Sequence, residues 1–220
     1  MEVELSKRRF TNNEDLANAI SHFVGAILSL AGLVLMVAVS FSKGNVWQIV
    51  SSAVFGLSMV FLYTSSTVAH SLREGKLKDT FFTLDQIAIF VLIAGTYTPL
   101  SLVALHGKPG WIIFCVEWGL ASIGIIRLLL RNNELKSVVG VIDILIYIGM
   151  GWLVVLVSGA VLKTVPAIGF IWIIIGGLFY TSGVIFFKIA KFHFHHLVWH
   201  LMVIAGTLSH FIAIFFYILK

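Results

Sequence analysis

Between Ala17 and Phe41 the chain reads ANAISHFVGAILSLAGLVLMVAVSF, a run of 25 residues without an Asp, Glu, Lys or Arg. A helix needs about 20 mostly apolar residues to cross the hydrocarbon core of a bilayer. Six further runs of this kind follow, separated by short connectors. The sequence therefore predicts an all-α polytopic membrane protein. We expect an N-terminal segment over residues 1–16 and a transmembrane domain over residues 17–220, with seven helices at 17–41, 46–70, 83–104, 111–131, 138–161, 167–187 and 195–219.

The composition supports this class of protein and excludes others. Of the 220 residues, 59% are hydrophobic and 11% are charged, and the mean hydropathy is +1.02. Because a soluble domain has about 25% charged residues, a soluble globular domain and a disordered chain are both excluded. The single cysteine, Cys115, excludes a disulfide framework and a thiolate zinc finger.

Lys and Arg residues are distributed unequally between the two ends of the predicted helices. With seven spans, 11 of the 15 lie on the side of the N-terminus and four on the other side. Cytoplasmic connectors carry an excess of Lys and Arg, so we expect a cytoplasmic N-terminus and an external C-terminus. The same bias explains the net charge of +5, which suits the anionic cytoplasmic leaflet of the cell membrane. No nucleic-acid partner is expected.

Polar side chains within the predicted helices meet at one depth, near the cytoplasmic side. Ser66 and His70 end the second helix, Asp85 lies near the start of the third, and His196 and His200 lie in the first turns of the seventh. The orientation was inferred from Lys and Arg alone, so this agreement in depth is independent of it. Residues four apart share one face of a helix, which applies to both pairs. We therefore expect a polar site in the cytoplasmic leaflet.

Three imidazoles from two helices are a suitable ligand set for zinc. We expect His70, His196 and His200 to bind Zn²⁺ and to leave the fourth position for water, as in catalytic zinc sites. Asp85 is placed to act as a general base, and Ser66 to donate a hydrogen bond to a carboxylate or an oxyanion. The competing interpretation gives all five residues structural roles. The three histidines would be hydrogen-bonded within the bundle, Asp85 would interact with the helix dipole, and Ser66 would allow close packing of helices.

Five other polar residues within the predicted helices receive weaker assignments. Asn18 and His22 lie at the depth of the site, and we expect them to orient neighbours rather than to bind metal. Glu117 and Asp143 are expected to form structural pairs, although Asp143 can also lie around the site. His210 is far toward the outer side, and we expect it to form a structural hydrogen bond.

At these residues the sequence resembles the bacterial hemolysin III family, within the progestin and adipoQ receptor group of membrane proteins. The similarity covers nearly the whole chain and includes EDLANAISH at 14–22, SSTVAHS at 65–71, LD at 84–85, AGTYTP at 94–99 and HLVWH at 196–200. It implies a seven-helix bundle with zinc near the cytoplasmic side, bound by His70, His196 and His200, with Ser66 and Asp85 beside it. One difference is Gln86, where a His is more usual in the family.

The wider group includes alkaline ceramidases, so the resemblance implies a zinc-dependent hydrolase that acts on a lipid amide or ester and contributes to membrane-lipid homeostasis. Its partners would be membrane lipids, with the substrate entering sideways from the bilayer. Two alternatives stay open: a non-enzymatic membrane sensor or receptor with structural zinc, and a cytolytic pore-former. Against a pore, the ionisable groups cluster at one depth instead of crossing the bilayer. The oligomeric state is left open.

Overall fold

A computed structural model describes residues 10–131, 139–189 and 192–219, and these residues are helical with no strand. The helices are α1 (Asn12–Ser42), α2 (Val46–Ser71), α3 (Lys76–Pro99), α4 (Gly107–Leu129), α5 (Val141–Leu156), α6 (Ser158–Val161), α7 (Ala167–Ile189) and α8 (His195–Ala213). Two π-helical segments, η1 (Leu100–Leu105) and η3 (Ile214–Ile218), extend α3 and α8. The all-α prediction is confirmed.

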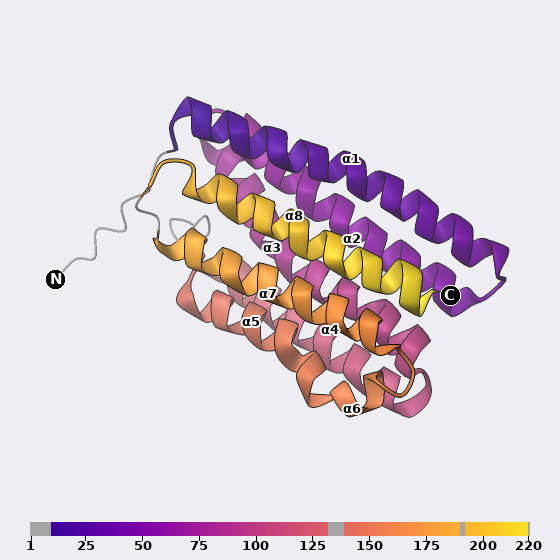
Figure 1. Ribbon diagram of the computed structural model, residues 1–220. Helices are drawn as coiled ribbons and strands as arrows, with labels where there is room; N and C mark the ends of the chain where they lie inside the picture. Colours follow the sequence, from indigo (N-terminus) through magenta and orange to yellow (C-terminus); the bar gives the residue numbers. More distant parts are fainter. Residues whose placement is uncertain (1–9, 132–138, 190–191, 220) are drawn as a thin grey trace.

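Six of the described helices are long and apolar enough to cross a membrane, and α5 is a shorter apolar helix in the position of the remaining span. These seven segments correspond to the seven runs predicted from the sequence. The chain is therefore a multi-pass membrane protein of about seven helices. Figure 1 shows them side by side along one direction, with the two chain ends at opposite ends of the bundle.

Helices α1, α3 and α4 begin earlier than predicted, and the changes in α1 and α3 affect the site. Thr11 caps α1: its hydroxyl accepts the Glu14 backbone N–H at 3.3 Å, while the Glu14 carboxylate accepts the Thr11 N–H at 3.0 Å. This reciprocal pair starts α1 at Asn12, although apolarity begins only at residue 17. Helix α3 begins at Lys76 and not at residue 83. Asp85 is therefore more than two turns inside α3.

The fifth predicted span, 138–161, is divided in the structure. Helix α5 ends at Leu156, and α6 is a single turn from Ser158 to Val161. Between them Val157 has φ −108° and ψ 9°, outside the helical region. Ser158 and Gly159 follow directly, and Gly and Ser pairs are a recognised cause of helix kinks. Hydrophobicity thus predicts the length of this span but not its break; residue 138 lies outside the described residues.

The packing of the helices brings the first helix, α1, against α2 and the last helix, α8, which carry the predicted zinc ligands. Helix α1 packs against α2 and α8, α2 packs against α3, and α7 packs against α8. Close approach of α1 and α2 requires a glycine, because a Cβ at Gly56 would lie 2.4 Å from a methyl carbon of Leu33. Phe55, Met59 and Leu62 of α2 belong to the buried hydrophobic core of the bundle. The N-terminal part of α1 therefore lies against both α2 and α8.

Candidate metal centre

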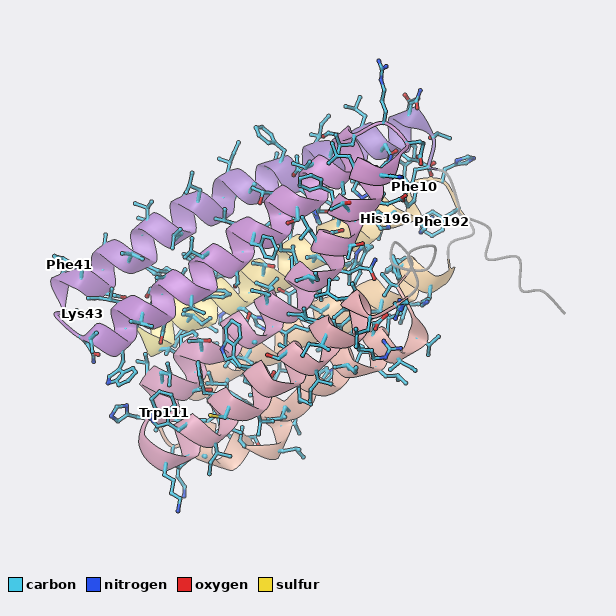
Figure 2. The ribbon with its side chains drawn as sticks, turned by 180° about the vertical axis from the view of Figure 1, so that it is seen from behind. Phe10, Phe41, Lys43, Trp111, Phe192 and His196 are labelled. Carbon is cyan, nitrogen blue, oxygen red and sulfur yellow. The ribbon has the colours of Figure 1, made fainter. Side chains whose placement is uncertain are left out.

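Three histidines predicted as zinc ligands come together in the structure. His70 is contributed by α2, and His196 and His200 by α8; one ring nitrogen from each lies within 4.8 Å of the others. The ring centroids are 5.1 Å apart for His70 and His196, 5.1 Å for His70 and His200, and 4.6 Å for His196 and His200. All three are buried. Figure 2 labels His196 at the end of the bundle near Phe10, opposite Lys43 and Trp111. This buried group can bind a metal ion.

The hydrogen bonds of two of these rings leave a nitrogen lone pair for a metal. His70 Nδ1 lies 2.8 Å from Asp15 Oδ1, and a carboxylate accepts, so Nδ1 carries the proton. His70 Nε2 is buried and has no hydrogen-bond partner among the described residues. The Ser21 hydroxyl lies 3.1 Å from His200 Nδ1 but donates to the Asn18 carbonyl at 2.8 Å. Nδ1 itself therefore donates to that carbonyl at 3.2 Å, which leaves Nε2 of the neutral ring unprotonated. A buried acceptor without a partner is costly, and a bound cation would satisfy it.

Ser66 and Asp85 lie beside this group, on α2 and α3. Ser66 is fully buried one turn before His70. Its hydroxyl lies near the Asp85 carboxyl, but the two form no hydrogen bond of good geometry. Phe82, three residues before Asp85, packs edge-on against His70 with the ring centroids 5.2 Å apart. The face of α3 that carries Asp85 is thus turned toward the histidines, and the catalytic roles of Ser66 and Asp85 stay a prediction.

Asn18 and His22 also contact the site, as their depth suggested. The His22 ring is stacked on His200 with centroids 3.5 Å apart and planes 12° apart. Neither the His22 ring nitrogens nor the Asn18 side-chain amide has a hydrogen bond of good geometry among the described residues. Asn18 orients His200 through its backbone carbonyl and not through its side chain.

Two residues of the site were not singled out from the sequence. Asp15 was placed in a polar N-terminal segment, and Lys78 in the connector before the third helix. In the structure the Asp15 carboxylate binds both the His70 ring and the Lys78 ammonium, the latter at 2.7 Å. The available signal was the spacing: Asp15 is three residues before Asn18, so the two share a face if α1 begins early enough to include both.

Phe10, which lies two residues before α1, covers one end of the site. The Phe10 ring packs against His196 and His70, with centroid distances of 4.8 Å and 5.7 Å. The Glu14 carboxylate accepts the Phe194 backbone N–H at 3.0 Å, which joins the start of α1 to the residue before α8. Phe194 has a positive φ of 62°, which is unusual for a residue with a side chain. Contacts from α1 therefore fix the entry into the helix that carries two of the histidines.

The remaining polar residues lie away from the histidine group. Asp143 is fully buried and pairs with Arg127 and Arg131, so its predicted structural pairing is observed. For Glu117 the pairing prediction is wrong within the described residues, because neither carboxylate oxygen has a hydrogen-bond partner. His210 Nε2 donates to the Ile173 carbonyl at 3.1 Å, which is the structural hydrogen bond expected.

The fold and this group define a class of protein: a multi-pass helical membrane protein with a buried histidine cluster, capable of metal binding, at one end of the bundle. Sequence comparison gives the family. The family described as "Haemolysin-III related" matches residues 10–211, which is most of the chain. The protein belongs to this family.

Individual relatives extend over nearly the whole chain. The Hemolysin-3 homolog of Bacillus subtilis (strain 168) is 37% identical over 211 residues, covering 96% of this chain and 97% of the relative. Hemolysin-3 of Bacillus cereus is 38% identical over 207 residues, covering 94% and 92%. The human Monocyte to macrophage differentiation factor is more distant, at 28% identity over 219 residues, covering 94% and 85%. Family membership supports a location in the cell membrane.

Proposed function

We propose that the protein is a zinc-dependent hydrolase that acts on an amide or ester bond of a membrane lipid and thereby contributes to membrane-lipid homeostasis. The observation that carries this proposal is the buried group of His70, His196 and His200 with the Asp85 carboxyl and the Ser66 hydroxyl beside it. Three imidazoles leave a zinc ion with an open position, which is the pattern of catalytic and not of structural zinc.

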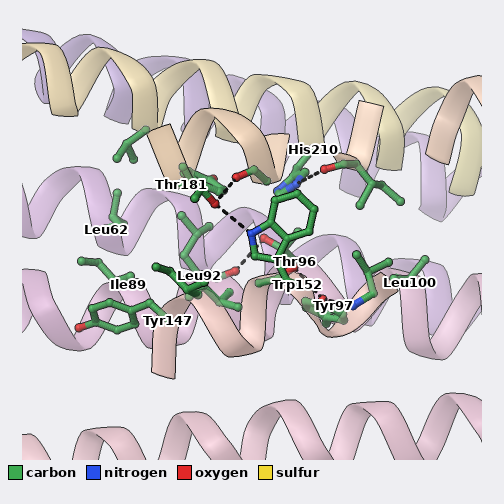
Figure 3. A pocket seen from close by; sticks show the side chains of 18 of the residues that line it. Leu62, Ile89, Leu92, Thr96, Tyr97, Leu100, Tyr147, Trp152, Thr181 and His210 are labelled. Carbon is green, nitrogen blue, oxygen red and sulfur yellow. Dashed lines mark hydrogen bonds between the residues drawn. The ribbon is translucent and has the colours of Figure 1, made fainter. Parts of the chain in front are cut away.

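An apolar cavity next to this group supports a lipid as the substrate. It measures about 100 Å³ and is lined mainly by α3, α5, α7 and α8. Figure 3 shows Leu62 and Ile89 at one end of this lining and Leu100 at the other, with Leu92, Trp152 and Thr181 between them. Leu62 lies one turn from Ser66 on α2, and Ile89 lies one turn from Asp85 on α3, so the lining of the cavity comes within one helical turn of these two residues. An acyl chain there would place its polar linkage near the histidines.

The roles of the side chains follow from their positions. Zinc, when bound, would polarise the substrate carbonyl and activate a water molecule. The Asp85 carboxyl is the general base that takes a proton from the attacking water and returns it to the leaving group. The Ser66 hydroxyl, one turn before His70, would donate a hydrogen bond to that carboxyl or to the developing oxyanion. The surrounding apolar residues exclude bulk water, which strengthens each of these electrostatic interactions.

A vesicle assay tests this proposal. The purified protein is reconstituted in phospholipid vesicles with lipid amides and esters labelled in the acyl chain, and released fatty acid is measured. We expect turnover that a zinc chelator removes and added Zn²⁺ restores. Asp85→Asn should reduce it by about 100-fold or more, since general-base catalysis contributes at least that much. Glu117→Gln is the matched control, because it changes a buried carboxyl to an amide in a helix that contributes no histidine to the group.

Other outcomes would favour the alternatives. A stoichiometric zinc ion with no turnover of any tested lipid would support a membrane sensor with structural zinc. Leakage of a trapped dye from vesicles, equal in wild type and Asp85→Asn, would support a pore-former, the activity that the name of the Bacillus cereus relative suggests. Turnover that is unaffected by Asp85→Asn would contradict the role given to Asp85.

A further inference from the structure

The Asp15 carboxylate connects three helices at the metal centre. It extends from the first turn of α1, accepts a hydrogen bond from His70 Nδ1 of α2 at 2.8 Å, and pairs with Lys78 Nζ of α3 at 2.7 Å. The Asp15 side chain is 17% exposed and the Lys78 side chain 6%. Charged side chains are rarely buried to this degree unless they have a specific partner. Each carboxylate oxygen here has its own partner.

Asp15 binds the Nδ1 atom of His70, and this suggests a role beyond holding the helices together. A carboxylate at Nδ1 fixes the proton on that nitrogen, so the lone pair lies on Nε2, the nitrogen without a hydrogen-bond partner in the described residues. Metal-binding histidines commonly donate their second ring nitrogen to a carboxylate or a backbone carbonyl, which fixes the ring orientation and makes the ligand a better donor. Asp15 has this relation to His70.

A second contact on the same helix repeats this relation with another ligand. Three residues after Asp15, the Asn18 backbone carbonyl accepts the proton of His200 Nδ1 at 3.2 Å. Asp15 and Asn18 share one face of α1, and that face lies against both α2 and α8. Helix α1 contributes no histidine to the group of three, yet it fixes the proton position of two of them.

We propose that Asp15, held by Lys78, is a positioning residue that orients His70 toward the metal, and that α1 is the element that aligns the metal ligands of α2 and α8. Lys78 keeps the Asp15 carboxylate in place and offsets its charge in a buried setting. This inference rests on the proposed metal site. It does not depend on the lipid hydrolysis proposed above.

Metal affinity is the quantity that tests this inference. Zinc binding to detergent-purified protein is measured by competition with a chelating dye for wild type, Asp15→Asn, Asp15→Leu and Lys78→Met. Loss of an outer-shell partner typically lowers metal affinity about 10- to 100-fold. We expect a loss in this range for Asp15→Leu, a smaller loss for the isosteric Asp15→Asn, and a loss for Lys78→Met as well. Glu74→Gln is the control, because Glu74 is an exposed second partner of Lys78 that does not reach His70.

Two further measurements separate positioning from a general loss of packing. The absorption spectrum of the cobalt-loaded protein reports the ligand field, and it should change in Asp15→Asn even where the protein is fully folded. The melting temperature of the metal-free variants reports only how much the Asp15 contacts stabilise the packing of α1 against α2 and α3. If Asp15→Asn and Asp15→Leu lower that temperature but bind zinc with wild-type affinity and spectrum, the positioning role is overturned and only the role in holding the helices together remains.

The same experiment distinguishes this inference from the proposed function. If wild type binds no zinc, both fail together. If wild type binds zinc and turns over no lipid, the hydrolase proposal fails, and the Asp15 variants still decide the positioning role. If wild type binds zinc and the Asp15 and Lys78 variants bind it equally well, the inference fails while the metal site stands.

Discussion

Two regions of the bundle, the end with the histidines and the middle of α4, bury polar side chains in different ways. At the end with the histidines, Asp15, His70 and Lys78 are linked by short hydrogen bonds across three helices. In the middle of α4 (Gly107–Leu129), Glu117 is completely buried, yet neither of its oxygens has a partner among the described residues. Buried polarity alone therefore does not identify a site. Groups of complementary chemistry that converge from several helices do.

The largest effect is expected where a buried charge loses its partner. Asp143 is fully buried and neutralises two arginines, Arg127 and Arg131, the second at 2.5 Å. It also accepts the Gly140 N–H at 2.9 Å. Asp143→Ala should lower the free energy of unfolding by about 3–5 kcal/mol, as breaking a buried ion pair does. Thermal unfolding in detergent measures this. A melting temperature equal to that of wild type would show that the pairs contribute nothing.

The next effect concerns the metal ligands themselves. His200→Ala removes one of three imidazoles and should weaken zinc binding by about 100-fold or more, equivalent to about 2.7 kcal/mol. The matched control is His210→Ala, on the same helix, because His210 is hydrogen-bonded to the Ile173 carbonyl and lies ten residues further along α8. Zinc titration of both variants gives the comparison. Equal zinc affinity in the two variants would contradict the proposed ligand set.

Much of this architecture could be predicted because membranes impose strong rules on a sequence. A run such as residues 17–41 has few alternatives to a spanning helix, since backbone groups in lipid must be satisfied within the helix. The convergence of His70, His196 and His200 followed from two observations, the Lys and Arg bias and the four-residue spacing. The four-residue spacing is a local feature of the sequence, and the Lys and Arg bias is a sum over the connectors. Neither requires knowledge of contacts between distant residues.

The parts that were missed depend on contacts between distant segments. Nothing near Lys78 in the sequence shows that it meets Asp15, 63 residues earlier. A hydropathy run also begins only where the chain becomes apolar. It therefore misplaced the starts of α1 and α3, where polar residues are helical because of a cap and tertiary pairing. The residues that orient the ligands lie in those two first turns.

A smaller effect is expected at Phe10, which covers the site. Phe10 packs on His196 and His70 from outside the helices. Phe10→Ala should open a path to the metal and speed zinc release to a chelator by about threefold to tenfold, equivalent to about 0.7–1.4 kcal/mol. Stopped-flow transfer to a chelating dye measures the rate. Phe192→Ala is the control, because Phe192 contacts the His195 ring instead. Identical release rates in all three proteins would contradict a covering role.

The smallest effect is expected at Glu117, and it tests the comparison between the two regions directly. When one member of a buried hydrogen-bonded pair is removed, the other member is left unsatisfied. This penalty accounts for most of the cost of such substitutions. Glu117 has no partner to leave behind among the described residues. Glu117→Leu should therefore change the free energy of unfolding by no more than about 1 kcal/mol and leave zinc affinity unchanged. Asp85→Leu, the same change beside the histidines, should abolish lipid turnover. If Glu117→Leu instead destabilised the protein as strongly as Asp143→Ala, the Glu117 carboxyl would have a partner of its own, and the two regions would be alike.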